Sequence, residues 1–187
     1  MTLEWAGPYS WPGFEKQNNL PSVPKHSGIY LMTSNYGEGY AIYAAGLTRR
    51  PISTRLREHT RKYMTGNYTI LDLEALHKGV RKELWHGWGW TPKKREMFDR
   101  RKEAILGSAR RQLKGFRIFV ANVDPGPRIL ERIEAAIMNA LYQQLPPLCG
   151  IPDKGMMLAG RSESESPLTI MNSCTARLHG LPTTISV

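Results

Sequence analysis

Cysteine is scarce in this chain, which has only Cys149 and Cys174 among its 187 residues. Two cysteines do not make the disulfide framework of a small secreted domain, so a reducing cytoplasm is the expected setting. Together with His179 they also lack the spacing and the fourth ligand of a structural zinc site.

Long apolar runs are absent as well. No stretch approaches the roughly 18 to 20 apolar residues that a membrane helix needs, so no membrane partner is expected. The first residues, MTLEWAGPYSWPG, lack a basic start followed by an apolar segment, and no signal peptide is expected there.

Negative charge is also in short supply. The chain carries 26 Lys and Arg against 16 Asp and Glu, which gives a net charge of +10. Segments 49–62 and 93–114 hold the whole excess. A single charge run is commonly a solvated helix face, but two such runs favour a nucleic-acid partner. The basic residues expected to bind phosphate groups are Arg49, Arg50, Lys62, Lys93, Lys94, Arg100, Arg101, Arg110 and Arg111.

The apolar periodicity is strong enough to predict the main elements. Pro51 fits the first turn of a helix, because proline has no N–H to leave unpaired. The segment NYGEG supplies the turn chemistry of a hairpin between the first two strands. The expected elements are strands at 28–33, 40–45 and 116–123 and helices at 51–64, 93–113 and 129–145, the second helix being weakened at Gly107.

This order of elements indicates one α/β domain of the α+β type. Short hairpins without regular strand–helix–strand crossovers favour a small sheet with helices packed on it. We expect four parts along the chain: an N-terminal arm at 1–26, which is irregular or a short helix, a core at 27–150, a basic helical insertion within it at about 65–115, and a C-terminal extension at 151–187 packed on the core.

Three polar side chains on the predicted helices could carry chemistry. Arg55 and His59 are four residues apart and therefore share one helix face, although an isolated pair of this kind is usually solvent-facing. Glu134 borders the buried stripe of the last helix, where a carboxylate needs a cation or hydrogen-bond donors. An ion pair with Arg128 or Arg132 and a role as metal ligand are both open.

Three tryptophans stand close together in the segment WHGWGWTP. Trp85, Trp88 and Trp90 could stack on bases or enter a groove of nucleic acid. The favoured interpretation is that they pin the insertion to the core.

Tyr30, Tyr43, Arg55, His59 and Glu134 form a recognisable set, and the chain resembles the GIY-YIG nuclease superfamily. The matching features, in chain order, are GIY at 28–30, a second strand that ends in a glycine at position 46, RLREH at 55–59, and a late helix with a glutamate that ends at LPPL. The likeness covers residues 25–64 and 116–150.

The resemblance implies a small three-stranded antiparallel sheet flanked by helices, and metal-dependent hydrolysis of DNA phosphodiester bonds. Tyr30 then corresponds to the tyrosine that activates the attacking water, and Arg55 to the arginine that steadies the phosphate. His59 matches the histidine or tyrosine one helical turn later, and Glu134 the carboxylate that holds a single Mg²⁺ or Mn²⁺. A phenol with a pKa of about 10 is rarely ionised at pH 7, so such a tyrosine requires neighbouring cations.

The second tyrosine departs from the family pattern. The position two residues before Gly46 is Ala44, and Tyr43 stands one residue early. Because strand side chains alternate, Tyr43 would face the opposite side unless a bulge before Gly46 restores its direction. The lysine that often follows the glycine is replaced by Leu47, and the asparagine expected after the last helix has no clear match in PPLCGIPD.

Two functions therefore remain open. The first is an endonuclease acting on double-stranded or branched DNA, whose insertion selects the substrate. The alternative is a nucleic-acid-binding module that keeps the fold without cleavage. A homodimer would suit an enzyme that cuts both strands, although the sequence carries no interface pattern.

Overall fold

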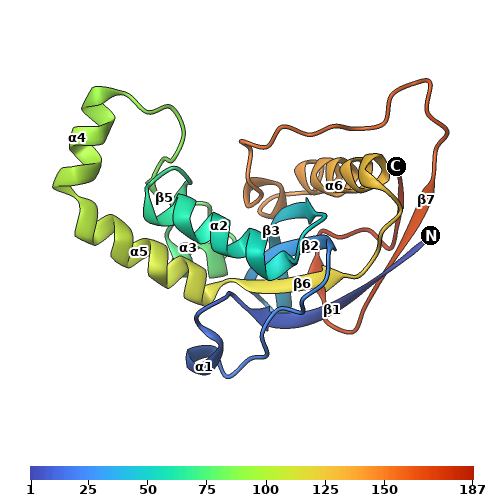
Figure 1. The fold of residues 1–187 in the computed structure, drawn as a ribbon, viewed down its shortest axis with the longest axis horizontal. Helices are drawn as coiled ribbons and strands as arrows, with labels where there is room; N and C mark the ends of the chain where they lie inside the picture. The colour runs from blue at the N-terminus through green and yellow to red at the C-terminus, as the bar shows by residue number, and fades with distance from the viewer.

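The computed structural model describes residues 1–187, which form a seven-stranded mixed sheet with helices packed against it (Figure 1). The strand order is β8-β3-β2-β6-β1-β7-β9. The strands of this sheet are β1 Thr2–Ser10, β2 Gly28–Tyr36, β3 Gly39–Thr48, β6 Arg117–Ala121, β7 Thr169–Cys174, β8 Leu178–His179 and β9 Thr184–Ser186.

The remaining elements lie around this sheet. The helices are α1 Glu15–Asn18, α2 Ile52–Met64, α3 Leu73–His77, α4 Pro92–Arg100, α5 Lys102–Gly115 and α6 Pro127–Tyr142, with a short 3-10 helix at Leu148–Gly150. A separate two-stranded sheet pairs β4 Ile70–Leu71 with β5 Glu83–Trp85. None of the helices combines the length and the apolar character that crossing a membrane requires.

The predicted small three-stranded antiparallel sheet is wrong, because four more strands extend it on both sides. The three predicted strands became β2, β3 and β6, which are antiparallel neighbours. Strand β1 continues the sheet beside β6, while β7 joins β1 and β8 joins β3 in parallel. The molecule is still an α/β protein, but its sheet is larger and mixed.

The additional strands come from the two ends of the chain. Residues 1–26 were expected to be an irregular arm or a short helix; they contain the short helix α1, but also the nine-residue strand β1. Leu3 and Trp5 alternate with exposed residues, as in a half-buried strand, but Gly7 and Pro8 interrupt that pattern. The pairing of β1 with β6 shifts register between Ala6 and Tyr9, where proline has no N–H to donate.

Helices α2 and α6 follow the apolar periodicity of the sequence. Helix α2 buries Ile52, Leu56 and Tyr63 on one face. Helix α6 begins with Pro127 in its first turn and buries a stripe that includes Ile133 and Ile137. The polar residues that border the buried face of each helix therefore lie close to the sheet, at the candidate site.

The basic insertion contains two helices where the periodicity predicted one. The break lies at Arg101, between α4 and α5, and not at Gly107. Phe98 is the one buried residue of α4 and packs against Trp85 and Trp90, with ring centroids 5.4 and 5.6 Å away. Figure 1 places α4 at the end of the molecule opposite β7 and the two termini.

Trp11 fastens the N-terminal segment to the rest of the core. Its fully buried indole donates a hydrogen bond to Thr60 Oγ1 at 2.8 Å and packs against Tyr63 and Phe116. We expect Trp11→Ala to lower the free energy of unfolding by about 3–5 kcal/mol, because it leaves a large cavity. Urea unfolding followed by circular dichroism measures the change.

Thr60→Val provides the matched control for this prediction. It keeps the indole, removes its hydrogen-bond partner and the bond that the Thr60 hydroxyl donates to the carbonyl oxygen of Leu56, and should cost about 1–2 kcal/mol. If Trp11→Ala costs no more than Thr60→Val, residues 1–26 are not part of the cooperative core.

Candidate active site

The pairing of β2 with β3 explains why a tyrosine and a glycine face each other. Tyr30 lies directly opposite Gly46 in the antiparallel register. A Cβ atom added at Gly46 would overlap the ring and hydroxyl of Tyr30. The absence of a side chain at this position therefore lets the phenol lie across the neighbouring strand.

A bulge in β3 redirects Tyr43. Met32 pairs with Ala44, and the next residue of β2, Thr33, pairs with Ile42, so Tyr43 has no partner of its own. Such an extra residue turns its side chain toward the face of its neighbour. The structure thus contains the bulge that the sequence required if Tyr43 was to share a face with Tyr30.

All five predicted site residues line one cavity of about 370 Å³. The residues are Tyr30 from β2, Tyr43 from β3, Arg55 and His59 from α2, and Glu134 from α6. Other side chains that line it were not predicted: Tyr63, Tyr68, Trp88, Asp153, Met156 and Met157.

Three rings form a hydrogen-bonded chain at the floor of the cavity. Nε2 of His59 lies 2.8 Å from the hydroxyl of Tyr30, and Nδ1 lies 3.1 Å from the hydroxyl of Tyr68. Burial lowers the pKa of His59 to about 4, and the nearby charge of Arg55 acts in the same direction. The imidazole is therefore neutral at pH 7, with one nitrogen that donates and one that accepts.

The phenol of Tyr30 resists ionisation in this environment. Burial raises its pKa well above the ordinary value of 10.0, while Arg55 acts to lower it. Arg55 is 40% exposed and also lies 3.3 Å from Glu58, which is held at 2.8 Å by Arg50. Its guanidinium thus stands between the buried phenol and the solvent, where it can meet an incoming anion.

Glu134 has no ionic partner among the ten salt bridges of the molecule. The ion pairs considered from sequence do not form. Arg128 binds Glu165 at 2.7 Å, and Arg132 donates to the carbonyl oxygens of Ser166 and Val187. Glu134 is therefore a carboxylate that faces the cavity without a cation.

This isolation changes the ionisation of Glu134. Burial raises its pKa to about 7, against the lowering effects of the Leu47 backbone and the Arg55 charge. No cluster of three or more His, Cys, Asp or Glu side chains suited to a metal occurs in the molecule. A single carboxylate without a cation does fit Mg²⁺, which keeps several waters and needs few protein ligands.

A second carboxylate reaches the cavity from the C-terminal segment. Asp153 donates its backbone N–H to the carbonyl oxygen of Tyr43 at 2.8 Å. Arg81 holds this segment through the carbonyl oxygens of Ile151 and Pro152 at 3.1 and 3.2 Å, and lies 5.7 Å from the Tyr43 ring centroid. Burial and the charge of Asp153 raise the pKa of Tyr43.

Asp153 is the residue for which the sequence held a usable signal. It lies in PPLCGIPD, the segment where the resemblance implies an asparagine, and it is the only acidic residue of that segment. Tyr68 carried no such signal, and Trp88 could not be told apart from Trp85 and Trp90, because both residues stand in irregular segments whose course only the fold determines.

Some of the predicted phosphate-binding side chains are engaged in contacts within the protein, and others are free. Arg50 binds Glu58, and Lys94 donates to the carbonyl oxygen of Trp88. Arg111 donates to Ser108, and Arg100 lies 3.9 Å from Glu96. The remaining ones are exposed and have no ion-pair partner: Arg49, Lys62, Lys93, Arg101 and Arg110.

Glu134 gives a stability prediction that does not depend on activity. Its pKa in the fold, about 7, lies above its ordinary value of 4.5, so ionisation destabilises the fold as the pH rises through this window. Glu134→Gln removes the ionisation. We expect the variant to gain about 2 kcal/mol relative to wild type between about pH 5 and pH 8, measured by urea unfolding at both values.

Glu131→Gln on the same helix is the matched control. Glu131 lies 3.3 Å from Arg128 and should show no such gain. A constant difference between wild type and Glu134→Gln at both pH values would mean that Glu134 is already ionised at about pH 5.

Comparisons with protein-family models, with curated proteins and with solved structures found no match for this chain. Its function therefore has to be inferred from the chemistry of the cavity.

Proposed function

We propose that this chain is a metal-dependent endonuclease that hydrolyses phosphodiester bonds of DNA. The observation that supports this most is the convergence of a phenol, an imidazole, a guanidinium and an unpaired carboxylate on one cavity. A desolvated carboxylate without a cation lowers stability, and such groups gather at functional sites.

Membership of the GIY-YIG superfamily is part of the proposal. The order of the site residues along the chain resembles that family, and the bulge at Tyr43 removes one objection to the likeness. The seven-stranded sheet is larger than the resemblance implied, so the support comes from the site residues alone.

Tyr30 activates the attacking water in this proposal. Its hydroxyl donates to Nε2 of His59 when Nδ1 carries the ring hydrogen, and its lone pairs then accept a hydrogen bond from water. A bound phosphate would place negative charge near His59 and raise its low pKa. The imidazole then accepts the phenolic proton as the phenol takes one from water, and the resulting hydroxide attacks phosphorus. The P–O bond to the leaving strand breaks, and the leaving oxygen takes a proton from solvent.

Arg55 and Glu134 meet the charges of the substrate. The half-exposed guanidinium can bind two phosphate oxygens and stabilise the charge that grows on them during attack. Glu134 would hold Mg²⁺ or Mn²⁺, and its ionisation would follow from the nearby positive charge. When bound, the cation would polarise the phosphate and favour the ionised form of Tyr30.

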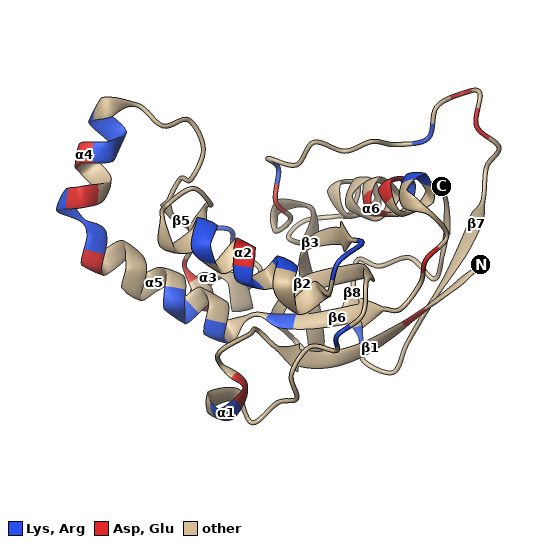
Figure 2. Ribbon diagram, in the orientation of Figure 1, with Lys and Arg blue, Asp and Glu red and all other residues tan.

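DNA is the proposed partner because of the charge of the molecule. The net charge is +10, and exposed basic residues lie on α2, α4 and α5 (Figure 2). Such surfaces bind phosphate backbones through counterion release. The cytoplasm remains the proposed compartment, and the free thiols of Cys149 and Cys174 support it.

Cleavage assays test the proposal directly. We expect the purified protein to cut plasmid or branched DNA with Mg²⁺ or Mn²⁺ and not with EDTA. Glu134→Ala should lower the rate at least about 100-fold, because it removes the carboxylate that holds the cation. The readout is the appearance of nicked or shortened DNA on a gel over time.

Glu131→Ala controls for the loss of a carboxylate from the same helix and should leave the rate unchanged. Absence of metal-dependent cutting in the wild type would refute the enzyme and favour the binding module. Equal rates for Glu131→Ala and Glu134→Ala would refute the metal assignment.

The two tyrosines should differ in their contribution. The hydroxyl of Tyr30 lies beside His59, whereas Tyr43 is surrounded by Arg81, Tyr63 and Asp153. We expect Tyr30→Phe to lower the single-turnover rate about 100-fold or more, as for loss of a general base. Tyr43→Phe should lower it less than about tenfold. Equal losses would give the two phenols a shared role.

A further inference from the structure

Two apolar side chains stand exposed at the mouth of the cavity. The exposed fractions of Trp88 and Met157 are 46% and 99%, and both residues line the cavity. We call these two residues the apolar shelf. Exposed apolar side chains at a cavity that also holds a few polar groups are typical of surfaces that a ligand covers.

The position of Trp88 is fixed by its neighbours. Its ring lies 6.0 Å from the ring of Tyr68, inclined by 38°. On the C-terminal segment, a Cβ atom at Gly155 would come within 2.8 Å of the indole nitrogen, so the glycine lets the indole lie close. Trp88 is thus held in place while almost half of its surface remains open.

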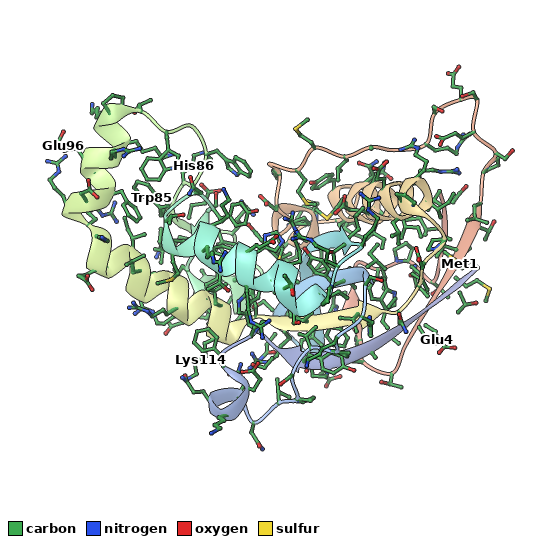
Figure 3. The ribbon with its side chains drawn as sticks, in the orientation of Figure 1. Met1, Glu4, Trp85, His86, Glu96 and Lys114 are labelled. Atoms are coloured by element: carbon green, nitrogen blue, oxygen red, sulfur yellow. The ribbon has the colours of Figure 1, made fainter.

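The neighbouring tryptophans have a different environment. Trp85 is buried and donates to the carbonyl oxygen of Gly66 at 2.7 Å. Trp90 packs against Phe98 and Trp85. Trp85 and His86 lie in the insertion, at the end of the molecule away from Met1 (Figure 3). Two of the three tryptophans therefore anchor the insertion, and Trp88 is the one whose side chain is largely exposed.

A row of rings connects the shelf with the floor of the cavity. From Trp88 the ring centroids follow Tyr68 at 6.0 Å, His59 a further 5.5 Å on, and Tyr30 a further 6.3 Å on. A ligand on the shelf would therefore occupy the same cavity as the groups that we assign to phosphate hydrolysis, with Tyr30 at the other end of the row of rings. Lys94 donates to the carbonyl oxygen of Trp88 and adds a positive charge beside the shelf.

We propose that the apolar shelf holds one unpaired nucleobase, and that the substrate is DNA with a single-stranded or splayed nucleotide next to the bond that is cut. This inference rests on the proposed function. A base inside a duplex is covered by its neighbours, whereas an unstacked base presents a face to an indole. Arg55 lines the same cavity and is suited to a phosphate of the same DNA strand.

A double-mutant cycle, with one change in the protein and one in the DNA, tests the contact between Trp88 and the base. The probes are a Y-shaped DNA with two unpaired arms, copies that each lack one base of an arm, and the matching full duplex, all measured in EDTA by fluorescence anisotropy. We expect wild type to bind the Y-shaped DNA at least about tenfold more tightly than the duplex. Removal of one particular base from an arm should lower this affinity about tenfold.

Trp88→Ala should lower the affinity for intact Y-shaped DNA by the same factor. It should bind the DNA that lacks this base no more weakly than the intact DNA, because both changes remove the same contact. Trp88→Phe keeps an aromatic face and should retain most of the affinity, which keeps the test valid if Trp88→Ala folds poorly. Met97→Ala removes an exposed apolar residue of α4 outside this cavity and should behave as wild type.

Additive losses, or equal affinity for Y-shaped DNA and duplex, would overturn the inference. Parallel cleavage reactions with Mn²⁺ separate it from the proposed function. Cutting without coupling at Trp88 would leave the endonuclease and remove the base site. Coupling without cutting would support the base site and refute the endonuclease.

Discussion

The close approach of Tyr30 to Gly46 is the contact on which the candidate site depends. The phenol crosses β3 because the opposite residue has no side chain, and from there its hydroxyl reaches His59 on α2. Strand and helix are thereby joined by a polar contact in a buried place, where an unpaired hydroxyl would be costly. The remaining groups of the cavity take their positions around this pair.

The fold was predictable where one segment carried a regular pattern. The hairpin of β2 and β3, strand β6 and helices α2 and α6 follow from apolar periodicity. The full sheet was not, because β1 is interrupted by Gly7 and Pro8, and β7, β8 and β9 are short strands whose partners lie far away in the chain. Pairing over such distances leaves little trace in local sequence.

The candidate site was likewise predictable only in part. Tyr30, Arg55 and His59 could be named because they stand at recognisable spacings, and Glu134 because it borders a buried stripe. The direction of Tyr43 depended on a bulge, which arises from the register of two strands and not from either one alone. Tyr68 and Trp88 reach the cavity from irregular segments.

The position of β1 also affects how the molecule can be made. Strand β1 lies between β6 and β7, and the terminal amine of Met1 donates to the carbonyl oxygen of Thr169, 168 residues later. Contacts of such sequence separation slow folding and prolong the exposure of apolar strands. During synthesis Leu3 and Trp5 are made well before Asn172 and Cys174, the residues of β7 with which they pair. Strand β1 can pair with β7 only after residues 169–174 have been made, so Leu3 and Trp5 stay exposed in the nascent chain until then.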